Sequence, residues 1–174
     1  NKTMEGSVSE TGPFESTMNE LIPATTYYVR AYATNEAGTG YGGEVSFTTD
    51  PMLPSVQTKP VSDIGTHSAV ANGAVLDLGS PAAYQHGFCW NSIGNPNISD
   101  SKAELGTVSE TGDFNALIAD LVPNTTYYIR AFASNAGGTS YGDEVEFNSA
   151  TSASAPIATI INAPAKITNA TAYS

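Results

Sequence analysis

The sequence has few of the residues that build catalytic or metal sites. It contains one cysteine, Cys89, so no intrachain disulfide can form, and a single thiol beside Trp90 is best explained as a small buried side chain. It contains two histidines, His67 and His86, which are too few for a convincing zinc site. His86 and Cys89 are three residues apart in a predicted strand, so they face opposite sides of it. We therefore expect no enzyme activity, no cofactor and no metal centre.

Basic residues and long apolar runs are also scarce. Six Lys and Arg residues face 17 Asp and Glu residues, giving a net charge of −11, and the acidic excess is present in both residues 1–50 and residues 51–150. Nucleic acids and anionic membranes attract clustered basic residues, so we expect neither as a partner. The oxygen-rich loop 95–100 holds one carboxylate, Asp100, which is a poor calcium site. No apolar run approaches the ~20 residues of a membrane span, so we expect no membrane insertion.

Short alternating segments are present where helical periodicity is absent. The clearest is 125–135, which has apolar and small residues at every second position. We assign one face of it to the core and the other to the polar side: Tyr127, Ile129, Ala131 and Ala133 against Tyr128, Arg130, Phe132 and Ser134. Further strands are predicted at 56–61, 68–75, 83–90, 113–121 and 141–147, with turns at 94–97 and 137–140. Short strands at this spacing indicate an all-β sandwich.

The sequence repeats itself. When residues 1–50 are placed over residues 101–150 without gaps, 25 of the 50 positions are identical. More weakly, residues 167–173 resemble residues 64–70. The pattern predicts the C-terminal half of one repeat at 1–50, a complete repeat at 51–150 and the start of a third repeat at 151–174.

Two segments resemble the corner that precedes strand F in fibronectin type III domains: Leu21-x-Pro23-x-Thr25-x-Tyr27 and Leu121-x-Pro123-x-Thr125-x-Tyr127. In that family a tyrosine hydroxyl at this corner bonds back to the upstream backbone. The resemblance implies that Tyr27 and Tyr127 have this role, with Leu121 and Pro123 forming the corner around Tyr127.

The whole repeat resembles the tandem fibronectin type III-like modules of secreted and surface proteins from Bacteroidota. The segments that carry the likeness are Gly87-Phe88-Cys89-Trp90, Asp100-Ser101-Lys102, Gly112-Asp113-Phe114 and residues 123–147. The resemblance implies tandem immunoglobulin-like β-sandwiches of about seven strands, one complete and two partial, with Cys89 and Trp90 as core residues. There is no Arg-Gly-Asp tripeptide, so the integrin-binding loop of animal fibronectin does not carry over.

Four aromatic residues fall on the predicted outward face of the repeated strand: Tyr28, Tyr32, Tyr128 and Phe132. Together they could form a glycan-binding platform or an interface with neighbouring chains. The simpler interpretation is cross-strand pairing with Tyr41 and Tyr141, covered by Arg30 and Arg130. Both remain open at this point.

These observations favour a non-catalytic structural segment of a long repeat protein, placed outside the cell or on its surface as a stalk, adhesin or filament. Its expected partners are neighbouring repeats or other copies of the protein. The alternatives are a module that binds a surface glycan or protein, and a spacer attached to a secreted hydrolase. Residues 1–50 and 151–174 together lack the stretch matching 75–100, so exchange between chain ends would not complete a repeat. We expect a longer chain, or another subunit that covers the open edges.

Overall fold

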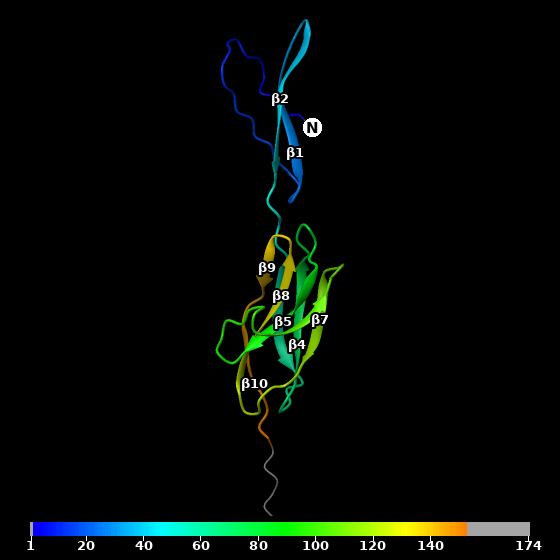
Figure 1. The fold of residues 1–174 in the computed structure, drawn as a ribbon, viewed down its shortest axis with the longest axis vertical. Coiled ribbons are helices and arrows are strands. Elements are labelled where there is room, and N and C mark those ends of the chain that lie inside the picture. The colour runs from blue at the N-terminus through cyan, green and yellow to red at the C-terminus, as the bar shows by residue number, and fades with distance from the viewer. Residues whose placement is uncertain (1, 153–174) are drawn as a thin grey trace, which may run out of the picture.

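The computed structural model describes residues 2–152, and this part of the chain is built from antiparallel strands without a helix (Figure 1). The predicted all-β class is therefore confirmed. The strands are β1 (Thr26–Asn35), β2 (Gly38–Thr48), β3 (Ser55–Ser62), β4 (Ala69–Asp77), β5 (Gln85–Asn91), β6 (Ser101–Gly106), β7 (Gly112–Ile118), β8 (Thr126–Asn135), β9 (Gly138–Tyr141) and β10 (Val145–Asn148).

Strands β3 to β10 form a sandwich of two sheets. One sheet has the order β3-β4-β7, and the other has the order β10-β8-β5-β6 with β9 also paired to β8. Strands β9 and β10 are two pieces of one return strand, because both pair with β8 on either side of a break at residues 142–144. Counted in this way the sandwich has seven strands, as the resemblance implied.

The core lies between the two sheets and follows the predicted alternation of β8. Ile129, Ala131 and Ala133 are fully buried and Tyr127 is nearly so. Small side chains on β8 face large ones on neighbouring strands, such as Phe88, which packs against Phe114 with ring centroids 4.8 Å apart. This complementarity of small and large residues fills the space between the sheets.

The outer face of β8 differs from the prediction. Phe132 is only 1% exposed and Ser134 only 5%, so the assignment of Phe132 to an open outward surface is wrong. The physical reason is the loop between β5 and β6, which folds over this sheet. Within the loop Pro96 is fully buried and Ile98 N donates to the Tyr141 hydroxyl at 3.2 Å.

Strand β6 was not predicted. Its sequence, Ser-Lys-Ala-Glu-Leu-Gly, is mostly exposed and alternates between polar and apolar residues only from Lys102 to Leu105. It is held as an edge strand by backbone pairing with β5, and Ala103 packs against the core. The pairing with β5, more than the burial of one face, therefore decides that these residues form a strand.

Strands β1 and β2 form a separate two-stranded hairpin. Figure 1 shows it extending from one end of the sandwich along the long axis of the molecule, with residues 2–20 running beside it. Those residues form no strand, and Thr3 O accepts a hydrogen bond from the Tyr32 hydroxyl at 3.1 Å. The third repeat predicted to start at 151 lies outside the described residues beyond residue 152.

Candidate functional site

Both predicted corners carry the hydrogen bond that the resemblance implied. The Tyr127 hydroxyl accepts from Val122 N at 3.0 Å, and the Tyr27 hydroxyl accepts from Ile22 N at 2.7 Å. Leu121, 2% exposed, lies beneath the second corner. Each corner fixes the chain where it enters the following strand. The backbone N–H of Val122 or Ile22 lies outside the sheet, and the hydroxyl of the tyrosine five residues later is its acceptor.

A hydroxyl at the end of each hairpin ties the last strand back to its corner. Ser149 Oγ donates to Val122 O at 2.6 Å and accepts from Thr125 N at 3.0 Å. Thr49 Oγ1 makes the matching bonds to Ile22 O and from Thr25 N, at 2.7 and 3.0 Å. We did not predict this brace. The signal in the sequence was a hydroxyl residue at the same position of both repeats.

The linker between the hairpin and the sandwich is held at both ends. Asp50 O accepts from Ala24 N at 3.1 Å, which binds the start of the linker to the hairpin. Met52 and Ser80 exchange two backbone bonds of 2.9 and 2.8 Å, which bind its other end to the sandwich. Only Pro51 stands between these anchors, and its ring fixes φ. The junction therefore has little freedom to bend.

Asn135 secures the same junction from the sandwich side and was also not predicted. Its Nδ2 donates to Met52 O at 2.7 Å and to Pro81 O at 2.8 Å, while its Oδ1 accepts from Gly137 N at 2.8 Å. The side chain is 2% exposed, so these bonds replace water completely. The repetition of asparagine at positions 35 and 135 was the signal in the sequence.

The four outward aromatics do not form one platform. Tyr28 is 70% exposed, Tyr32 and Tyr128 are half-buried, and Phe132 is buried. The structure instead pairs the arginines with tyrosines of the facing strand: Arg30 lies 5.4 Å from the Tyr41 ring centroid, and Arg130 lies 4.8 Å from that of Tyr141. This is the cross-strand arrangement that the simpler interpretation described.

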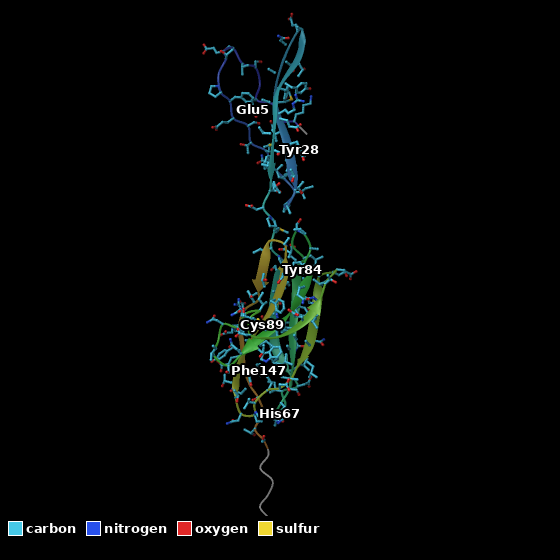
Figure 2. All side chains as sticks on the ribbon, in the orientation of Figure 1. Glu5, Tyr28, His67, Tyr84, Cys89 and Phe147 are labelled. Atoms are coloured by element: carbon cyan, nitrogen blue, oxygen red, sulfur yellow. The ribbon has the colours of Figure 1, made fainter. Side chains whose placement is uncertain are left out.

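The nucleophilic and titratable side chains do not converge. Cys89 is fully buried on the outer side of β5, and burial raises the pKa of its thiol to about 11. His86 points to the other side, its ring 4.9 Å from that of Phe114. His67 donates from Nδ1 to Leu121 O at 2.9 Å, at the opposite end of the sandwich from Tyr84 (Figure 2).

In the loop 95–100, considered above for calcium, the single carboxylate accepts hydrogen bonds from neighbouring residues. The Asp100 carboxylate accepts from Asn97 N at 2.9 Å and from Asn91 Nδ2 at 3.2 Å. Across residues 2–152 no three His, Cys, Asp or Glu side chains gather closely enough to hold a metal ion.

The same residues contain no helix with the length and apolar character needed to span a bilayer. Trp90 packs against the edge of the core.

A hollow of about 440 Å³ opens on the outer side of β5, β6 and β8. Tyr84, which is 59% exposed, stands at its edge, with Gln85, Glu104 and Ser134 among the lining residues. Gln85 Oε1 is buried there and receives no hydrogen bond from the described part of the protein. A buried acceptor without a donor is costly to the fold.

No protein-family model matches the sequence. A mouse protein, "Fibronectin type III domain containing protein 3C1", is 31% identical over 121 residues, which is 69% of this chain and 9% of that protein. The chain thus spans about a tenth of the length of this curated relative.

Among solved structures, the rat CD45 extracellular region, domains d3-d4, superposes with a TM-score of 0.54 at 16% identity, covering 86% of this chain and 76% of that one. The sensor domain of the anti-sigma factor RsgI4 from Pseudobacteroides cellulosolvens has a TM-score of 0.45 at 18% identity, with coverage of 56% and 95%. Strand order, the tyrosine corner and the likeness to the CD45 domains define the fold as an all-β sandwich of the fibronectin type III-like kind. Domains of this kind are generally non-catalytic and often serve as structural or binding modules.

Proposed function

We propose that this chain is a non-catalytic structural segment of a secreted or cell-surface repeat protein that acts as a stalk, adhesin or filament. The junction at Pro51 carries the proposal, because the residues on either side are bonded to different modules. Its partners are neighbouring repeats of the same chain or other copies.

The end of the second repeat supports a regular array. Asn124 N donates to Ala150 O at 3.2 Å, the same bond that Ala24 N makes to Asp50 O at 3.1 Å. A chain leaving both repeats by the same route would place successive modules in similar orientations. The high negative charge would keep such a rod soluble and extended.

Small-angle X-ray scattering of the full chain tests the rod. We expect a narrow, elongated distribution of distances for the unmodified chain. A variant with Pro51→Gly and a Gly-Gly-Ser-Gly insertion after Asp50 should broaden it, because the two anchors are then separated by freely rotating residues. Pro13→Gly, outside the junction, is the control and should change nothing. A broad distribution for the unmodified chain would contradict the proposal.

The location is tested separately with antibodies against the 174-residue chain. We expect labelling of intact, unpermeabilised source cells or of their medium. Labelling that requires permeabilisation would place the protein inside the cell and remove the stalk, adhesin and filament roles together. A spacer beside a secreted hydrolase is distinguished by the parent sequence, where a catalytic domain would be evident.

The hollow beside Tyr84 favours glycan binding as a second candidate function. The exposed ring of Tyr84 offers a stacking surface for a sugar, and Glu104 and Ser134 are polar residues that line the same hollow. Glycan-array screening tests it with Tyr84→Ala, which should abolish any signal, and Tyr28→Ala, which should not. A clean array with the unmodified chain removes this candidate.

A further inference from the structure

Within residues 2–152, one apolar sheet face is uncovered. Phe47 on β2 is 37% exposed and Val45 is 65% exposed, and Ala31 and Ala33 on β1 are exposed beside them. At the matching positions of the sandwich, Phe147, Ala131 and Ala133 are buried. The hairpin therefore presents to solvent the surface that β8 and β10 present to the core.

The cover over β8 to β10 is the sheet β3-β4-β7, and β3 makes the closest approach. Thr58 Oγ1 accepts a buried hydrogen bond from Ala131 N at 2.9 Å. A Cβ added at Gly142 would come within 2.5 Å of Thr58 N, so the approach of β3 requires glycine there. The interface thus depends on an alanine amide, a glycine and a threonine.

The hairpin has the same alanine and glycine, but no strand in the position of β3 lies against them in residues 2–152. Ala31 and Gly42 match Ala131 and Gly142, yet a Cβ at Gly42 would meet nothing closer than 3.6 Å. Ala31 lies at a break in the β1–β2 register between Arg30 and Tyr32. No side chain of residues 2–152 hydrogen-bonds the Ala31 amide. The close approach of a β3-like strand would explain these small residues, and residues 2–152 place no such strand against the hairpin.

We propose that this uncovered face is a docking surface for a three-stranded half-module with the pattern of β3, β4 and β5, supplied by another repeat of this kind. A threonine hydroxyl of the β3-like strand accepts from Ala31 N, and that strand passes over Gly42. Its β4-like strand offers an edge to residues 12–18, which match β7, so Phe14 takes the place of Phe114. In the occupant the β3-like and β4-like strands cover the apolar face, and the β5-like strand pairs with β1 as β5 pairs with β8. The inference stands on the fold independently of the extracellular role.

The chain itself supplies a probe, because residues 51–100 contain β3, β4 and β5. The full chain is extended at its N-terminus by a second copy of residues 51–100, with Cys89→Ala in both copies. Phe47→Cys then reports on the docking surface through its rate of thiol labelling. We expect labelling to be about a hundredfold slower, or more, in the extended chain than in the unextended one.

Matched variants make the result specific. Glu36→Cys lies at the hairpin tip, where the matching Ala136 is exposed in the sandwich, and should label equally fast in both chains. An extension carrying Val56→Asp and Phe88→Asp lacks the apolar complement and should restore fast labelling of the Phe47→Cys thiol. Hydrogen exchange of the Ala31 amide, which needs no substitution in the hairpin, should slow in the extended chain only.

Two outcomes overturn the proposal. If the Phe47→Cys thiol and the Ala31 amide stay as reactive in the extended chain as in the unextended chain, the face does not accept a half-module. If the unextended chain already protects the thiol, and protection increases with protein concentration, a second complete copy occupies the face instead.

Discussion

In the hairpin β1–β2, Tyr27 stacks on Phe47 with ring centroids 5.8 Å apart, and in the sandwich Tyr127 stacks on Phe147 at 5.7 Å. The residue pairing also agrees: Asn35 faces Gly38 as Asn135 faces Gly138. Residues 1–50 and 101–150 share half of their residues, and they share this local geometry. They differ in burial, since Phe47 is 37% exposed and Phe147 is 6% exposed. Pairing within the hairpin is therefore local, whereas burial is supplied by distant strands.

Residues 12–18 and 112–118 match in the alignment of the two repeats but differ in secondary structure. Residues 112–118 form β7 because β4 offers them an edge, with pairs such as Val70 opposite Leu117. Residues 12–18 have no such neighbour in the described part of the chain and form no strand, although Phe14 matches Phe114. Phe14 is 59% exposed. A strand that depends on a distant partner is lost with that partner, while a hairpin that pairs with itself remains.

The largest contrast is expected from the two matched phenylalanines. Phe147→Ala should lower the free energy of unfolding of the sandwich by about 3–5 kcal/mol, because it empties part of the core. Phe47→Ala should leave it within about 0.5 kcal/mol of the parent chain. Urea unfolding followed by fluorescence measures both, since Trp90, the single tryptophan, packs against the sandwich core. Equal effects would mean that the two regions unfold as one unit.

A smaller contrast is expected from the matched asparagines. Asn135→Ala should cost about 1–3 kcal/mol, because Met52 O and Pro81 O both lose their donor in a buried site. Asn35→Ala loses only the turn bond to Ala37 N, at 2.9 Å, in an exposed position, and should not change the same unfolding curve. A loss of stability from Asn35→Ala as large as that from Asn135→Ala would show that the hairpin supports the sandwich.

Cys89 gives a pH-dependent effect that is confined to the sandwich. Burial raises the pKa of its thiol from 9.0 to about 11. Between these values the unfolded chain releases the proton and the folded chain keeps it, so stability falls as pH rises from 9 to 11. Below pH 9 the thiol contributes no pH dependence. Cys89→Ala should remove this part of the slope, measured by urea unfolding at each pH; an unchanged slope would assign it to other groups.

The smallest effect is expected from the ion pair that joins β3 to β7. Lys59 Nζ lies 2.6 Å from Asp113 Oδ1, but the Asp113 side chain is 76% exposed. Asp113→Ala should therefore cost less than about 1 kcal/mol. The difference should shrink further in 1 M salt, where the Debye length is about 3 Å. The first repeat has Pro13 at this position, so Pro13→Ala serves as the matched control and should leave the sandwich unchanged. A cost that salt does not reduce would indicate a packing role for Asp113.

The sequence alone was sufficient for the features that depend on near neighbours. The alternation in 125–135 predicted both β8 and its core face. The resemblance of the Leu-x-Pro-x-Thr-x-Tyr segments to the fibronectin type III corner implied the corner bonds of Tyr27 and Tyr127. Strand β6 was not predicted, because only four of its residues alternate and it is held mainly by backbone pairing at the edge of β5. The predicted strand 113–121 also ran too far, since β7 ends at Ile118.

The tertiary structure alone decided which faces of the strands are buried by other parts of the chain. Phe132 belongs to the polar half of an alternating strand, and it is buried only because loop 92–100 crosses it. Asn35 and Asn135 are the same residue in the same turn, yet only Asn135 meets the linker. Alternation and turn bonds arise within a few residues and are written into the local sequence. Which faces are covered depends on strands and loops far along the chain, so the same residues are core in one repeat and surface in the other.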